Sequence, residues 1–250
     1  MRDNLTIYDN QNTQNPGAPG AVLFVHGAGG GAWQWEEVAR LLSDGYRVAA
    51  IDLSGHGKAP KKPEEHTLET YIGDVLEAIR ELGGGPVALC GHSMGGAVAM
   101  QTCFDHPEAV GALILANTGA RLRVLPSLFD ALAVDSPAAV KMMSLFAFGP
   151  DAPQKLLDEY AAHLLETDPE IVTRDFRICD AFDAMSRIGE IRCPALIIAC
   201  ENDRLTPVKY SAWLHNNIPG SRLRVFPARG HSAMMEEPGE FAEEVRAFLR

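Results

Sequence analysis

The chain has 250 residues, of which 46% are hydrophobic and 22% charged, and its formal net charge at pH 7 is −11. This composition suits one α/β domain with room for an insertion, and it excludes a globally disordered chain. The acidic balance, with no basic cluster longer than Lys61-Lys62, argues against a nucleic-acid partner.

Cysteine usage and apolar run lengths indicate the compartment. The five cysteines are odd in number and form no C-x-x-C pair, so we expect free thiols in a reducing cytosol and no zinc site. The N-terminus leads into no apolar signal-peptide core, and no apolar run approaches the roughly 18 residues that a spanning helix needs. The sequence therefore predicts a cytoplasmic protein without a membrane partner.

Short apolar runs of strand type alternate with amphipathic runs of helix type in the first half of the chain. We expect an edge strand near residues 5–8, a loop over 10–20, and a second loop over 55–65. The predicted strands that follow cover residues 21–26, 47–52, 86–90 and 110–116. The predicted helices cover residues 35–42 and 68–82, the latter with Thr67 as N-cap, and a third runs from the end of the 86–90 strand to His106-Pro107. The alternation predicts a mostly parallel central sheet flanked by helices.

The rhythm breaks over residues 119–188, where helix-like stretches are punctuated by five prolines and no comparable strand occurs. It resumes with predicted strands at 195–199 and 222–226 and predicted helices at 208–217 and 238–250. We therefore expect an α/β core formed by residues 1–118 and 189–250, with a helical cap inserted at 119–188.

The stretch Gly91-His92-Ser93-Met94-Gly95 matches the G-x-S-x-G pattern and joins a buried strand to a helix. A serine at such a junction sits on a sharp turn that presents its hydroxyl at the top of a sheet, and the flanking glycines let neighbouring chain pass close by. Ser93 is therefore the predicted nucleophile.

A serine hydroxyl needs a base and a group that orients the base. In this architecture the chain order is serine, acid, histidine. His231 follows the last strand, on the same sheet edge as Ser93, whereas His215 lies within a helical pattern. Asp203 follows the preceding strand and is the predicted acid, with Glu201 as the weaker candidate.

Two backbone N–H groups should bind the oxyanion. Met94 follows the serine at a helix start, and Ala28 lies in the loop His26-Gly27-Ala28-Gly29-Gly30-Gly31. The competing interpretation of this loop is a dinucleotide cradle, because residues 27–32 read G-x-G-x-x-A, with Asp52 as the one possible ribose partner. The oxyanion interpretation fits better, and we expect no cofactor and no metal.

Together these motifs resemble the α/β-hydrolase superfamily over nearly the whole chain. The resemblance rests on Val25-His26-Gly27, Asp52-Leu53-Ser54-Gly55-His56-Gly57, Gly91-His92-Ser93-Met94-Gly95-Gly96, Asn202-Asp203 and Gly230-His231. It implies the α/β-hydrolase fold, with the cap between the sixth and seventh core strands, and the triad Ser93, Asp203 and His231. The glycine loop with its following tryptophans looks most like small carboxylesterases.

Other candidate residues have structural as well as functional interpretations. Asp52 and His56 look like an acid–base pair, but their glycine-rich stretch favours a structural turn. We expect His26 to fix the glycine loop and His66 to lie on the surface or at a helix end. Residues Met142, Met143, Leu145, Phe146 and Phe148 should form an apolar cluster in the cap. Four residues are candidates for the wall of a substrate pocket: Trp33, Met142, Phe146 and Phe148.

The sequence thus predicts a serine hydrolase that cleaves small to medium, fairly apolar carboxylic esters with water through an acyl-enzyme. A lactonase, a C–C bond hydrolase, an amidase or a perhydrolase could use the same triad. A non-enzymatic ligand receptor with this fold remains a remote alternative. The substrate and the oligomeric state are left open.

Overall fold

The structure is a computed structural model that describes residues 4–8, 21–62 and 66–250. Its centre is a seven-stranded sheet with the order β1-β3-β2-β4-β5-β6-β7. The strands are β1 (Leu5–Tyr8), β2 (Val22–Val25), β3 (Val48–Ile51), β4 (Val87–His92), β5 (Val110–Ala116), β6 (Ala195–Cys200) and β7 (Arg222–Phe226). Among the strands of the described residues, β1 alone runs antiparallel to its neighbour. The predicted α/β-hydrolase fold class is confirmed, and the expected loop over 10–20 lies outside the described residues.

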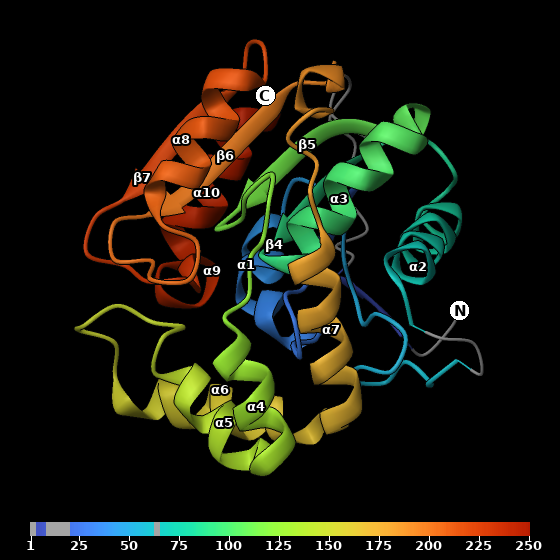
Figure 1. Ribbon diagram of the computed structural model, residues 1–250. Helices are drawn as coiled ribbons and strands as arrows, with labels where there is room; N and C mark the ends of the chain where they lie inside the picture. Colours follow the sequence, from blue (N-terminus) through green and yellow to red (C-terminus); the bar gives the residue numbers. More distant parts are fainter. Residues whose placement is uncertain (1–3, 9–20, 63–65) are drawn as a thin grey trace.

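Helices cover both faces of the sheet, so its central strands are buried on both sides (Figure 1). One face packs against α2 (Leu68–Glu81), α3 (Met94–Asp105) and α8 (Val208–Asn217). The other packs against the 3-10 turn η1 (Ala32–Trp35), α1 (Glu36–Leu42), α9 (Ala233–Glu236) and α10 (Pro238–Leu249). Every residue of β2, β3, β4 and β6 is buried, which explains why these strands are continuous apolar runs instead of alternating ones. Two further 3-10 turns are η2 (Pro107–Ala109) and η3 (Ile188–Glu190).

Helix α2 begins where its cap residue predicts. The Thr67 hydroxyl accepts a hydrogen bond from the Thr70 backbone N–H, and the Thr70 hydroxyl accepts one from the Thr67 N–H. This reciprocal box satisfies two amides that the helix itself leaves unbonded. The four-residue helix α9, by contrast, was not predicted, because the sequence between His231 and Pro238 is too short to show a helical period.

The chain between β5 and β6 contains the inserted segment of residues 119–188, which we call the cap. It holds four helices, α4 (Pro126–Val134), α5 (Ser136–Ser144), α6 (Gln154–Glu166) and α7 (Pro169–Ala181). A bridge between Arg121 and Asp183 joins the two arms of the cap where they leave the core. In Figure 1, α4, α5 and α6 form a separate group below the sheet, while α7 runs back toward α3. Within the described ranges, no helix is long and apolar enough to cross a membrane.

Candidate active site

Ser93 occupies the sharp turn between β4 and α3. Its φ is 52° and its ψ is −116°, a backbone conformation that a non-glycine residue adopts only under strain. The glycines on either side permit the turn: a Cβ added to Gly91 would lie 2.1 Å from the Gly95 carbonyl oxygen, and one added to Gly95 would lie 2.4 Å from that of Val25. This sharp turn therefore presents the Ser93 side chain above the end of β4.

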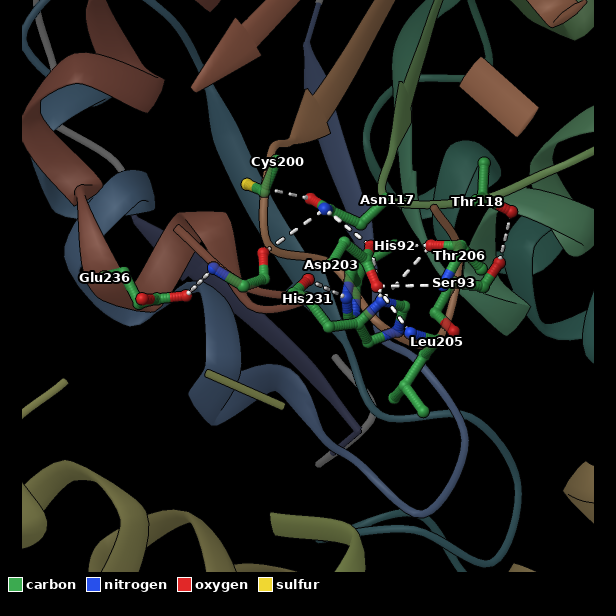
Figure 2. Close-up of polar contacts among 11 residues, drawn as sticks. His92, Ser93, Asn117, Thr118, Cys200, Asp203, Leu205, Thr206, His231 and Glu236 are labelled. Carbon is green, nitrogen blue, oxygen red and sulfur yellow. Dashed lines mark hydrogen bonds and ion pairs between the residues drawn. The ribbon is translucent and has the colours of Figure 1, made fainter. Parts of the chain in front are cut away.

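Asp203 and His231 come from the loops after β6 and β7, and the structure brings them into contact. The His231 Nδ1 lies 2.9 Å from the Asp203 Oδ2, and both side chains are buried. Figure 2 shows Ser93 in the same group of residues. Three elements far apart in sequence thus deliver a hydroxyl, an imidazole and a carboxylate to one edge of the sheet.

The Asp203 carboxylate is fully engaged. Its Oδ1 accepts hydrogen bonds from the backbone N–H groups of Leu205 and Thr206, at 2.9 and 2.8 Å. Its Oδ2 accepts from the Thr206 hydroxyl at 2.7 Å and from the Asn117 amide at 2.9 Å. Burial raises the pKa of Asp203, but the charge and hydrogen bond of His231 and the other donors outweigh it and hold the pKa well below its ordinary value. The group is therefore a fixed anion facing the imidazole.

Asn117 is a site residue to which the sequence analysis gave no role. It directly follows β5 with a φ of 47°, and its side-chain amide donates to Asp203 and to the Gly230 carbonyl oxygen. The signal in the sequence was a polar residue directly after a buried strand. Glu201, the weaker candidate acid, is exposed and accepts instead from the Ala228 N–H at 3.3 Å. His215 lies in α8 and contacts the Ser221 hydroxyl.

The glycine loop follows β2 and forms a turn in which the Gly30 N–H donates to the Gly27 carbonyl at 3.0 Å. Ala28 and Gly29 are its central residues, and the Gly29 φ of +67° is one that glycine adopts without strain. His26 holds the base of the loop as expected: its Nδ1 lies 2.8 Å from the Gly27 carbonyl oxygen, and its Nε2 accepts from the Leu53 N–H. Met94, the other expected oxyanion donor, is the first residue of α3.

Asp52 and His56 are not partners of each other. The Asp52 carboxylate accepts from the backbone N–H groups of Ala32 and Lys58, at 2.7 and 3.1 Å, so it closes the loops around it and is not a free ribose ligand. The His56 Nε2 instead lies 2.8 Å from the Asp175 Oδ2, and both side chains are fully buried. Asp175 belongs to the cap and was not among the predicted site residues. Of the two expected places for His66, the structure has the helix end and not the surface: the residue directly precedes the N-cap of α2, and its buried ring accepts a hydrogen bond from the Lys62 N–H.

The four candidate pocket residues lie in different surroundings. Trp33 stacks on His163 at 4.5 Å between ring centroids, Phe148 meets Tyr160 edge to face at 5.1 Å, and the Arg204 guanidinium lies over the Phe146 ring. The predicted apolar cap cluster is wrong for Met142 and Leu145, which are 46% and 57% exposed on and just after α5. The cluster that forms uses Val140, Ala147, Phe148, Tyr160 and Leu164 instead. The sequence of a short helix does not show which other helix it packs against, so the buried side of α5 could not be predicted from it.

Across the part of the chain that the structure describes, no group of three or more His, Cys, Asp or Glu side chains could hold a metal ion. The polar side chains at the site are a carboxylate, an imidazole and the hydroxyl of a serine with a strained backbone. This arrangement suits proton transfer from a hydroxyl to a ring nitrogen.

Several known proteins to which this chain is similar are hydrolases. The family model described as "Alpha/beta hydrolase family" matches residues 22–244. A Klebsiella pneumoniae protein named as a carbamate hydrolase, RutD, is 30% identical, over 90% of this chain and 89% of its own. A thermophilic esterase from Thermogutta terrifontis has a TM-score of 0.86 at 25% identity, covering 98% of this chain and 93% of its own. An enol-lactonase from Burkholderia xenovorans has a TM-score of 0.87 at 25% identity, covering 98% and 95%.

Proposed function

The chain belongs to the alpha/beta hydrolase family and is a hydrolase, and on that premise we propose that it is a serine carboxylesterase for small to medium, fairly apolar esters. The observation that carries this proposal is the 2.9 Å contact between the His231 Nδ1 and the Asp203 Oδ2, at the sheet edge that also bears the strained Ser93. A cytoplasmic location remains a prediction.

In the proposed reaction, His231 removes the proton from the Ser93 hydroxyl as the oxygen attacks the ester carbonyl carbon. The negative charge that develops on the carbonyl oxygen is bound by the backbone N–H groups of Ala28 and Met94. His231 then protonates the leaving alcohol, and a water molecule activated by the same imidazole releases the acid. Asp203 holds the ring in the tautomer that leaves Nε2 free to accept, and stabilises the imidazolium without taking its proton.

Lactones are the second candidate substrates, favoured by the likeness to an enol-lactonase at 25% identity. A lactone is a cyclic ester, so the same triad would open it by the same steps, with the alcohol kept on the product. Carbamates, suggested by the RutD relative, place a nitrogen beside the carbonyl carbon and are less electrophilic than esters. The shape of the cap decides whether esters, lactones or carbamates are the preferred substrates.

The test is steady-state hydrolysis of p-nitrophenyl esters from acetate upward, with a lactone and a carbamate in parallel, by the wild type and Ser93→Ala. We expect turnover that falls by several orders of magnitude in Ser93→Ala, with the preferred chain length measuring the acyl pocket. If the wild type hydrolyses the lactone or the carbamate fast and the esters slowly, that substrate class would replace esters in the proposed function. Binding without multiple turnover of any of the three would favour a receptor and would refute the esterase proposal.

A further inference from the structure

The cap places one buried carboxylate against the glycine loop. Asp175, on α7, is fully buried, and its Oδ2 accepts a hydrogen bond from the Gly29 backbone N–H at 2.7 Å. The same oxygen lies 2.8 Å from the His56 Nε2, and the other oxygen accepts from the Tyr71 hydroxyl at 2.6 Å. A carboxylate is costly to bury unless charged or polar donors surround it. Three donors from three core segments therefore hold this cap residue in place.

The second polar group of Gly29 is also bound by the cap. The Thr167 hydroxyl, between α6 and α7, donates to the Gly29 carbonyl at 3.0 Å. Leu164 and Val172 pack around the same glycine, each with a methyl carbon 3.4 Å from the position a Cβ would take. Both hydrogen-bonding groups of the central turn residue are thus satisfied from residues more than 130 positions away in the chain.

Charge strengthens the hold on the carboxylate. Burial would lower the pKa of His56, but the charge and the hydrogen bond of Asp175 outweigh it, so the pKa of His56 is raised. Burial would raise the pKa of Asp175, but His56, Tyr71 and the Gly29 amide outweigh it and lower its pKa. Because its pKa is lowered, the Asp175 carboxylate is ionised, and the hydrogen bond that it accepts from Gly29 is a charge-assisted one, which is shorter and stronger than a neutral bond.

We propose that Asp175 and Thr167 are positioning residues, through which the cap fixes the Gly27–Gly30 turn so that the Ala28 N–H faces the oxyanion. This inference rests on the proposed function of that amide. The Ala28 N–H shares a peptide plane with the Gly27 carbonyl, which the Gly30 N–H and the His26 ring hold from the core side. Asp175 fixes the next plane, between Ala28 and Gly29, and Thr167 fixes the plane after Gly29. The two cap residues therefore hold the half of the turn that follows the donor, and their loss would loosen the turn that sets the direction of the Ala28 N–H.

The experiment compares Thr167→Val and Asp175→Ala with two matched variants. Thr167→Ser keeps the hydroxyl and should restore what Thr167→Val loses. Tyr71→Phe removes a hydrogen bond of the same carboxylate but none to the loop. For each variant we would measure kcat and KM on the p-nitrophenyl ester that the wild type hydrolyses best, the melting temperature, and hydrogen exchange of the backbone amides of residues 27–31.

Loss of one oxyanion donor costs about 10²–10³ in kcat, so a displaced donor should cost somewhat less. We expect Asp175→Ala to lower kcat by about tenfold to a hundredfold and Thr167→Val by about tenfold, both at unchanged KM and with faster exchange in the loop. Tyr71→Phe leaves the Gly29 hydrogen bond of Asp175 in place, so it should lower the melting temperature but change kcat and loop exchange much less than Asp175→Ala does. A purely structural role would lower the melting temperature in all these variants without separating kcat from KM.

Several outcomes would overturn the inference. Unchanged loop exchange in Thr167→Val and Asp175→Ala would show that the cap does not hold the turn. Faster exchange with unchanged kcat would show that the held turn does not serve catalysis. If Asp175→Ala does not fold, the pair Thr167→Val and Thr167→Ser decides. If the wild type hydrolyses none of the esters, the proposed function fails, while loop exchange still decides whether the cap holds the turn.

Discussion

The His92 ring, one residue before Ser93, donates from Nε2 to the backbone carbonyl oxygen of His231 at 2.9 Å. The two rings also pack at 4.6 Å between centroids. His92, the residue between Gly91 and Ser93 in the G-x-S-x-G stretch, therefore does more than fill space behind the serine. It ties the turn that carries Ser93 to the loop that carries His231, and it does so only when Nε2 carries a proton.

The first prediction concerns acid stability. Burial, followed by the nearby charge of His231, lowers the pKa of His92 from 6.5 to about 3. Below pH 6.5 the unfolded chain binds a proton here that the folded protein does not, so stability present above pH 6.5 is lost progressively between about pH 6.5 and 3. At pH 5 the loss from this residue is about 2 kcal/mol.

His92→Gln removes the titrating ring and keeps a donor at the same reach. Urea unfolding at pH 7.5 and pH 5 should show a smaller decrease for His92→Gln than for the wild type, by about 2 kcal/mol. The comparison is needed because His26, with its pKa lowered to about 4 by burial and by His56, acts in the same direction, while the raised pKa of His56 acts in the opposite one. Equal decreases in the two proteins would contradict the prediction.

The second prediction concerns the acid of the triad. Asp203→Asn keeps the shape of the side chain but replaces one oxygen by an amide nitrogen, which favours the wrong imidazole tautomer at His231. We expect kcat to fall by a factor on the order of 10⁴. Glu201→Gln is the matched control, because this nearby carboxylate is exposed and accepts its hydrogen bond from the Ala228 N–H and not from the triad. A larger loss in Glu201→Gln than in Asp203→Asn would reverse the assignment of the acid.

The sequence specified the parts of the fold that depend on neighbouring residues. The strand Val110–Ala116 and the helix Val208–Asn217 coincide with their predicted bounds, because a short continuous apolar run marks a buried strand and a helical pattern marks a helix. The Asp175–His56 pair could not be predicted in this way, since its residues are 119 positions apart. One signal was present: in α7 the buried positions Ile171, Asp175 and Cys179 are spaced by four, so an aspartate interrupts an otherwise apolar stripe.

The third prediction tests the close packing of the cap on the histidine loop. A Cβ added to Gly230, the residue before His231, would lie 2.2 Å from the Phe148 carbonyl carbon and 2.5 Å from the Gly149 nitrogen. Because these are backbone atoms, Gly230→Ala must shift the cap or the loop, and we expect lower melting temperature and much lower kcat. Gly73→Ala is the control: it lies inside α2 with open space around it. That substitution should stabilise the protein by about 0.5–1 kcal/mol with unchanged kcat, because alanine favours a helix.

The fourth prediction concerns Glu236, which sequence reasoning did not single out. Its Oε1 accepts from the Gly230 N–H at 2.7 Å and its Oε2 from the Gly149 N–H at 2.9 Å, so one side chain on α9 bridges the histidine loop and the cap. The Ser232 N–H adds a second link by donating to the Ala147 carbonyl at 2.8 Å. In Figure 2, Glu236 lies on the far side of His231 from Ser93.

In Glu236→Gln only one side-chain oxygen is left to accept from the Gly230 and Gly149 N–H groups. The new amide nitrogen faces the other N–H and cannot accept from it. Leaving one half-buried N–H without an acceptor should cost about 1 kcal/mol of unfolding free energy, the lower end of the range for buried donors. Because the Gly230 amide precedes His231, we expect kcat to fall as well. Glu243→Gln, an exposed carboxylate on α10, is the matched control and should change neither quantity. Chemical denaturation and ester kinetics on both variants test this, and a Glu236→Gln protein as stable and active as Glu243→Gln would show that the bridge does not hold the loop.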